Sequence, residues 1–170
     1  YWPLVTVSYM FDRHLWGMRP AGYHATNIAL HWLCCMLVVV LGTAVVGLSW
    51  GASLAAALLF AVHPVHTESV TWISGRTDLL ATALMLSGWL VHVRAEAVPS
   101  ARARRWTLLS AAAAIWFAAL LAKELAVALP FMIAAFAVGR MDVRRRLAGL
   151  APHLVALARL DEARDVWQNA

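Results

Sequence analysis

The apolar run from Ile28 to Leu48 is the feature that most constrains this chain, because it contains no acidic or basic residue other than one histidine. About 20 such residues form a helix that crosses the roughly 30 Å hydrocarbon core of a bilayer. Hydrophobic residues make up 62% of the 170 residues, against roughly 45–50% in an ordinary soluble domain. Four further mostly apolar runs follow, at Ala52–Val65, Leu79–Val98, Trp106–Ala122 and Leu125–Gly139. We therefore expect an all-α fold: a polytopic membrane helix bundle of about five transmembrane helices with a short amphipathic C-terminal helix.

The basic residues predict an orientation for these helices, since Lys and Arg favour the cytoplasmic side of a membrane. If each run crosses once, the arginine-rich segments Arg94–Arg105 and Arg140–Arg146 lie on one face. This arrangement requires a hairpin between Trp106 and Gly139, with Lys123 and Glu124 at its tip. The positive charges gather at the ends of apolar runs rather than in a basic stripe, so no nucleic-acid partner is expected.

Three of the apolar runs are short for a bilayer, which predicts a polar vestibule. About 15–17 helical residues rise only about 22–26 Å. Polar backbone below the membrane surface is tolerated only where protein buries it or a wet cavity receives it. The ends concerned, His63-Pro64 and Lys123-Glu124, both fall on the non-cytoplasmic side in this topology. We expect the polar site on that face.

A polar stripe runs along the first long helix at helical spacing. His24, Asn27, His31 and Cys35 follow one another at intervals of three or four residues, so they share a helix face. That face is expected to point into the bundle, because polar groups facing lipid are costly. Hydrogen bonds between helices and contact with a substrate both remain open as its role. Cys34 and Cys35 are expected to be small core residues.

A second polar cluster begins at His63-Pro64-Val65-His66-Thr67-Glu68. Pro64 suits the first position of a short helix. On such a helix Glu68 lies about 140° from His63 and about 160° from His66, at about 100° per residue. The three side chains cannot then meet at one ion, so no metal site is expected.

The cluster continues to Ser74-Gly75-Arg76-Thr77-Asp78. Ionisable groups within the membrane are functional candidates, so Glu68 and Arg76 are candidates here. The alternative for Arg76 is an ion pair with Asp78. Thr77 or Asp78 is also expected to cap the helix that follows Gly75. At the hairpin tip, Lys123 and Glu124 either point into a cavity or form an exposed turn, and the short flanking helices favour the cavity.

Four segments of the sequence resemble one group of glycosyltransferases. They are Tyr1–Tyr9 (YWPLVTVSY), Gly22–His31 (GYHATNIALH), His63–Asp78 (HPVHTESVTWISGRTD), and Ala122-Lys123-Glu124 followed by Leu129-Pro130. In this order they resemble the transmembrane and tetratricopeptide-repeat (TPR) O-mannosyltransferases and their bacterial homologues, of the GT-C superfamily. The similarity covers most of Tyr1–Arg146.

This resemblance implies transfer of a sugar, mannose in that family, from polyprenyl or dolichyl phosphate to Ser/Thr hydroxyls of a protein. The implied partners are a lipid-linked sugar donor, a protein acceptor and the bilayer, with no cofactor. Arg76 and Lys123 would contact the phosphate, and His63, His66 and Glu68 would position donor or acceptor. The substrate-binding residues implied or inferred are, in full, His24, Asn27, His63, His66, Glu68, Arg76, Lys123 and Glu124.

The resemblance also implies departures from the family. The family's catalytic base lies on an acidic loop ahead of the segment that begins at Tyr1, so the catalytic residue is unknown, with Glu68 and Glu124 as candidates. The family's Arg-Pro-Leu stands here as Trp2-Pro3-Leu4. We expect a truncated enzyme, inactive as it stands, in a bacterial inner membrane or, in a eukaryote, the endoplasmic reticulum membrane.

Two domains are expected: 1–146, a partial GT-C-like transmembrane domain, and 147–170, a cytoplasmic or interfacial helical tail. Part of that tail, Leu157–Ala170 (LARLDEARDVWQNA), resembles a TPR helix. Two other functions remain open: a non-catalytic membrane scaffold that binds a partner through the TPR-like tail, and a small transporter that uses the inward histidines.

Overall fold

A computed structural model describes residues 2–97 and 102–139, which are almost entirely helical and contain no strand. This confirms the all-α prediction for those ranges. The chain divides into two units, Tyr1–Leu129 and Pro130–Ala170. The predicted tail at 147–170 lies outside the described residues, as do Arg140–Arg146.

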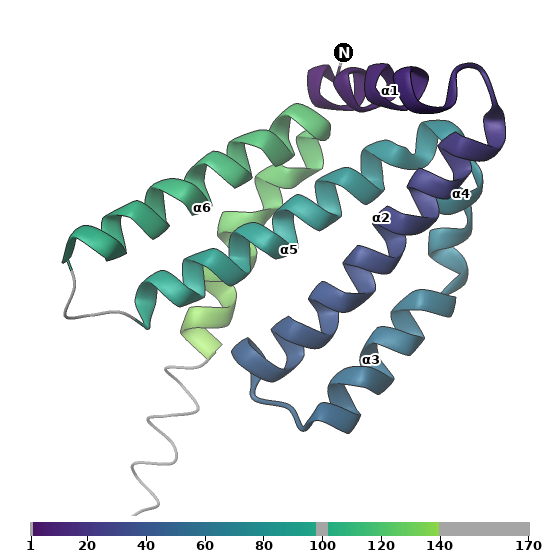
Figure 1. Ribbon diagram of the computed structural model, residues 1–170. Coiled ribbons are helices and arrows are strands. Elements are labelled where there is room, and N and C mark those ends of the chain that lie inside the picture. The colour runs from purple at the N-terminus through teal and green to yellow at the C-terminus, as the bar shows by residue number, and fades with distance from the viewer. Residues whose placement is uncertain (1, 98–101, 140–170) are drawn as a thin grey trace, which may run out of the picture. The chain divides into compact units, whose positions relative to one another are not determined.

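The longer helices of the first unit are α1 (Pro3–Trp16), α2 (Pro20–Leu41), α3 (Trp50–Val62), α5 (Arg76–Glu96) and α6 (Arg102–Ala122). A π-helical turn, η1 (Gly42–Val46), extends α2. Four short elements complete the unit: η2 (Pro64–His66), α4 (Thr67–Thr71), η3 (Ile73–Gly75) and η4 (Glu124–Val127). In Figure 1, α5 lies between α2 and α6, α3 packs beside α2, and α1 crosses the end of the bundle, where it contacts α2, α5 and α6.

Local sequence explains where several of these helices begin and end. Proline occupies the first turn of α1, α2 and η2, where its missing N–H has no helical partner to lose. Gly17 ends α1 with φ 63°, a conformation that glycine adopts without steric cost. Ser49 caps α3 by accepting a hydrogen bond from the Ala52 N–H at 3.3 Å. The short helix at Pro64 is as predicted.

The hairpin break falls where the sequence predicts it. α6 ends at Ala122, and Lys123 is extended, with φ −161° and ψ 137°. Within η4 the chain turns back onto α6. The indole N–H of Trp116, on α6, donates to the Ala126 carbonyl of η4 at 2.8 Å.

The start of α5 differs from the prediction. Its N-cap residue is Gly75, without a side-chain cap, so the expected capping by Thr77 or Asp78 is wrong. The helix begins at Arg76, which puts both residues inside its first turn. There the Thr77 hydroxyl donates to the Ser74 carbonyl at 3.5 Å.

Fewer helices of the described residues meet the length and hydropathy of a membrane span than the expected five. In the described residues two helices are long and apolar enough to cross a membrane, Pro20–Val46 and Arg102–Ala122, whereas Trp50–Val62 and Glu124–Gly139 are shorter apolar helices. α5 is as long as α6, but it carries Arg76 and Asp78 in its first turn and Arg94 and Glu96 at its end. The expected five spans are not established.

The inward polar stripe on α2 is confirmed. Asn27, Cys34 and Cys35 are buried, and His24 and His31 are half-buried. A small residue, Gly88, lies where α5 contacts α6. Gly88 has Ala112 and Ile115 of α6 as neighbours, and small side chains allow helix backbones to approach closely.

Candidate functional site

The guanidinium of Arg76 lies at the centre of a buried polar network that joins α1, α2 and α5. Arg76 and Asn27 are 0% exposed, and Asp12 is 1% exposed. An Nη of Arg76 lies 2.5 Å from a carboxylate oxygen of Asp12, and its Nε donates to the Asn27 side-chain oxygen at 2.9 Å. The Asp12 carboxylate also accepts from the Thr26 hydroxyl at 2.9 Å. Arg76 and Asp12 therefore form a buried ion pair.

Backbone groups and aromatic rings take up the rest of the guanidinium. It donates to the carbonyls of Tyr23 at 3.1 Å and Ser8 at 3.4 Å. It also lies 4.7 Å from the centre of the Tyr9 ring, a cation–π contact. The Tyr9 hydroxyl donates to the Ile73 carbonyl at 2.7 Å. Burial raises the pKa of Tyr9, although the positive charge of Arg76 opposes that shift.

The network also fixes the short segment that leads into α5. The side-chain amide of Asn27 donates to the Trp72 carbonyl at 2.9 Å, one residue before the carbonyl that Tyr9 binds. Asn27 thus links the Arg76 guanidinium to the backbone of the α4–α5 connection. The predicted substrate-contact residues Arg76 and Asn27 come together here, at a position closed to solvent.

Asp12 is the network residue that the sequence reasoning missed. The sequence offers Asp78 as a partner for Arg76, but the structure pairs Arg76 with Asp12 and pairs Asp78 with Lys123. A sequence signal did exist. Asp12 is the only acidic residue before α2, and it lies seven residues after the buried Val5, which is the spacing of one helix face.

The tip of the predicted hairpin forms a second charged group beside the start of α5. The Lys123 ammonium binds the Asp78 carboxylate, with the two side chains 27% and 40% exposed. The indole N–H of Trp2 donates to the Glu124 carboxylate at 3.0 Å. This indole N–H, the backbone at Glu124 and the nearby Lys123 charge lower the pKa of Glu124. Asp78 of α5 thus holds Lys123, and Trp2, just before α1, holds Glu124.

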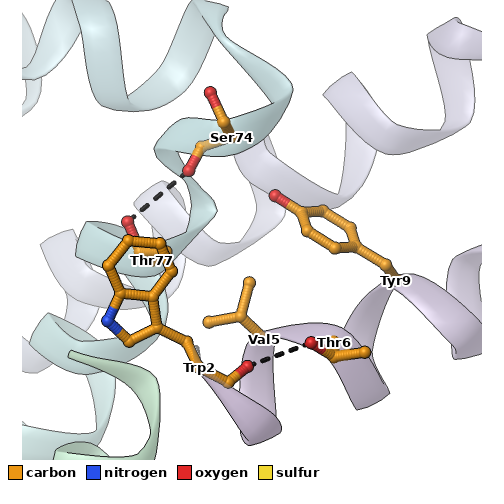
Figure 2. A pocket seen from close by; sticks show the side chains of 6 residues that line it. All are labelled: Trp2, Val5, Thr6, Tyr9, Ser74 and Thr77. Atoms are coloured by element: carbon orange, nitrogen blue, oxygen red, sulfur yellow. Dashed lines mark hydrogen bonds between the residues drawn. The ribbon is translucent and has the colours of Figure 1, made fainter.

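An open pocket of about 240 Å³ lies between α1 and the start of α5. Figure 2 shows Trp2 and Tyr9 on two sides of it, with Val5 between them. Thr6, Ser74 and Thr77 complete the lining. Because Trp2 also binds Glu124, the pocket adjoins the charged group at the hairpin tip.

His31, His63 and His66 form a separate group with Phe60. The His66 ring centre lies 4.1 Å from that of Phe60, 5.5 Å from that of His31 and 6.1 Å from that of His63. A ring nitrogen of His31 is 3.1 Å from the Ala61 carbonyl oxygen. His63 turns back on its own chain and accepts from the Val65 N–H at 3.2 Å. Within the described ranges, no group of three or more His, Cys, Asp or Glu side chains could hold a metal ion.

The stability of this histidine group is expected to fall on acidification. Burial, followed by the His31 and His63 rings, lowers the pKa of His66 below its ordinary value of 6.5. The unfolded chain therefore binds the proton first, and the free energy of unfolding decreases as pH falls below about 6.5 until the lower folded pKa is passed. Thermal unfolding between pH 7.5 and 5 measures this slope. His66→Phe should reduce the slope, and an identical slope in that variant would contradict the assignment.

The two remaining predicted residues lie on α2 and α4. His24 is half-buried on α2, and Glu68 is exposed in the first turn of α4. The eight predicted residues thus fall into a buried network (Asn27, Arg76), a charged tip (Lys123, Glu124), a histidine group (His63, His66) and two single positions (His24, Glu68).

Comparison with known proteins finds relatives with one kind of name. The chain is 36% identical over 149 residues to Protein O-mannosyl-transferase Tmtc2 of Drosophila melanogaster, which covers 86% of this chain and 15% of that protein. It is 42% identical over 94 residues to Protein O-mannosyl-transferase TMTC1 of Mus musculus, covering 55% of this chain and 10% of the relative. The chain is a relative of these protein O-mannosyl-transferases. Protein O-mannosyl-transferase TMTC4 of Homo sapiens is 38% identical over 108 residues, 56% of this chain and 15% of its own length.

These relatives confirm the resemblance found in the four sequence segments. This chain corresponds to about 10–15% of the length of each relative cited, so the activity of a whole O-mannosyl-transferase does not transfer to it directly. No family model matches the chain, and no solved structure matches it.

Proposed function

We propose that this chain forms part of the donor site of a membrane glycosyltransferase that moves mannose from a polyprenyl or dolichyl phosphate to Ser/Thr hydroxyls of proteins. The observation that carries the proposal is the similarity to protein O-mannosyl-transferases over up to 86% of the chain. The charged tip beside the aromatic pocket supports it, because the reaction needs a cation for the leaving phosphate and a shaped site for the sugar.

Lys123 is the proposed phosphate contact. An ammonium group has three N–H donors, and the carboxylate of Asp78 leaves donors free for a second anion. Arg76 is less suited, since its guanidinium is 0% exposed and binds Asp12, Asn27 and two backbone carbonyls. In this proposal Arg76 holds α1 and the α4–α5 connection in place, and Lys123 meets the donor.

Donor binding tests the role of Lys123. Lys123→Ala is expected to weaken the binding of dolichyl phosphate mannose to the full chain in detergent by about tenfold or more, because a hydrogen bond to a charged group contributes about 1.5–3 kcal/mol. Asp78→Asn is the matched control: it breaks the same ion pair but keeps the ammonium. If Asp78→Asn weakened binding as much as Lys123→Ala, the ion pair would matter only for the fold.

Transfer itself is measured in a chimera. The segment of the mouse relative that matches this chain is replaced by the corresponding residues of the chain, and mannose transfer to a Ser/Thr peptide is assayed in membranes. We expect transfer in the chimera and loss of transfer with Lys123→Ala. A chain that binds no donor, together with a chimera that is inactive although correctly inserted, would favour the scaffold function.

The proposed orientation places the hairpin tip on the non-cytoplasmic face. Leu125 and Arg104 are both exposed, and they belong to opposite ends of the α6 hairpin. Leu125→Cys should react with a membrane-impermeant maleimide from the outside of the membrane only, and Arg104→Cys from the cytoplasmic side only. Labelling of Leu125→Cys from the cytoplasmic side alone would reverse the proposed orientation.

A further inference from the structure

Three of the four hydroxyl groups that line the aromatic pocket donate a hydrogen bond to a backbone carbonyl of the protein. Thr6 donates to the Trp2 carbonyl at 3.2 Å and Thr77 to the Ser74 carbonyl at 3.5 Å, as Figure 2 shows. Tyr9 donates to the Ile73 carbonyl at 2.7 Å. A hydroxyl has one donor and two acceptor lone pairs. These three groups can therefore offer a ligand only acceptors.

The carboxylate bound to the pocket residue Trp2 is likewise a hydrogen-bond acceptor. Glu124 is exposed and ionised, with one carboxylate oxygen bound to the Trp2 indole N–H at 3.0 Å. Its other oxygen is a further acceptor. A phosphate group needs donors, so these groups do not favour it. A ligand with several O–H donors fits the polar side of the pocket.

The walls of the pocket are apolar and flat. Trp2 and Tyr9 face the space from two sides, and Val5 lies between them (Figure 2). The volume of about 240 Å³ is below the roughly 300–1,000 Å³ of pockets for drug-sized ligands, so a single ring fits better than a whole lipid-linked donor. A hexopyranose combines the required properties: a C–H face that packs on an aromatic ring and hydroxyl donors around its edge.

We propose that the pocket formed by Trp2, Val5, Thr6, Tyr9, Ser74 and Thr77 binds the pyranose ring of the donor sugar. This inference rests on the proposed function and adds to it a sugar subsite that is separate from the phosphate contact at Lys123. Trp2 stacks on the ring, and the Thr6 and Thr77 oxygens accept hydrogen bonds from its hydroxyls. Glu124 accepts a further hydroxyl at the rim.

The test compares two lipids that differ only in the sugar. Binding of dolichyl phosphate mannose and of dolichyl phosphate is measured on the full chain in detergent, for wild type, Trp2→Ala and Thr77→Val. Each variant should bind the sugar-bearing lipid about two- to tenfold more weakly, the effect expected for one aromatic or hydrogen-bond contact, and should bind dolichyl phosphate as wild type does. Unchanged binding of dolichyl phosphate also shows that the variant is folded.

Two further variants sharpen the comparison. Trp2→Phe keeps an aromatic face without the bond to Glu124, so it should retain more sugar-dependent affinity than Trp2→Ala. Trp106→Ala removes another exposed tryptophan, at the start of α6, and should change neither affinity.

The outcomes separate this inference from the proposed function. Equal loss of both lipids in Trp2→Ala and Thr77→Val would overturn the sugar subsite, because the pocket would then serve the lipid, the phosphate or the fold. Wild-type affinity for both lipids in both variants would also overturn it, while donor binding by wild type would leave the proposed function standing. A wild-type chain that binds neither lipid would overturn the proposed function together with the subsite.

Discussion

Replacing Arg76 with methionine is expected to lower the free energy of unfolding by about 3–5 kcal/mol, the range for removing one partner of a buried ion pair. The loss leaves the Asp12 carboxylate, which is 1% exposed, without its counter-charge. It also leaves the side-chain oxygen of Asn27 and two backbone carbonyls without their donor. Chemical denaturation of the chain in detergent micelles measures the change.

Two comparisons identify the buried charge as the cause. Arg94→Met removes an exposed arginine near the other end of the same helix and should change the free energy of unfolding by less than about 1 kcal/mol. The double variant Arg76→Met with Asp12→Leu removes both charges and should recover part of the loss. A double variant that is less stable than the sum of the two single variants would contradict the pairing.

Gly75→Ala is expected to destabilise the chain by about 1–3 kcal/mol, the usual range for overpacking. A Cβ at Gly75 would lie 2.6 Å from both the Cα and the carbonyl oxygen of Ser69, and 2.8 Å from the Glu68 carbonyl oxygen. These are backbone atoms, so no side-chain rotation relieves the clash. The φ of Gly75 is −64°, which any residue adopts, and the effect is therefore one of space alone.

Gly51→Ala is the matched control for this prediction. A Cβ at Gly51 meets no atom within 4 Å, and alanine has a higher helix propensity than glycine by about 1 kcal/mol. Gly51→Ala should therefore be neutral or slightly stabilising, as measured by thermal unfolding. Equal destabilisation by the two variants would show that the contact of Gly75 with Ser69 is not the cause.

Much of the helical architecture could be predicted from local patterns. The apolar runs, the proline at the first position of the short helix after His63 and the break at Lys123 follow from residues that are neighbours in sequence. The inward face of α2 follows from the helical spacing of His24, Asn27 and His31. At each of these positions the structure depends on residues that are close in sequence, so it can be predicted without knowledge of a distant partner.

The partner of Arg76 required more than local pattern. Asp78 was the considered partner because it is near in sequence, yet residues at i and i+2 do not face each other on a helix. Once Arg76 begins α5, the only carboxylate that it binds in the described residues comes from α1. Sequence alone does not show that α1 crosses the end of α2 and α5, and this crossing is what brings Asp12 to Arg76.

The candidate site shows the same division. Lys123 and Glu124 were predicted to lie at a break after α6, with a cavity favoured over an exposed turn. The structure places the break there, with Asp78 and Trp2 as partners, but leaves Glu124 exposed. The aromatic pocket was not predicted, because its walls come from residues at the start of α1 and the start of α5, which are about 70 residues apart in sequence.

The network around Arg76 has a consequence for the order in which the protein assembles during synthesis. The acid Asp12 and the amide Asn27 leave the ribosome first, and the base that satisfies them follows 49 residues after Asn27. In a nascent chain that ends before Arg76, the Asp12 carboxylate lacks the guanidinium that it binds in the folded protein, so the charge at this buried position is not yet compensated. The ion pair that fixes α1 therefore forms only after the start of α5 has been synthesised.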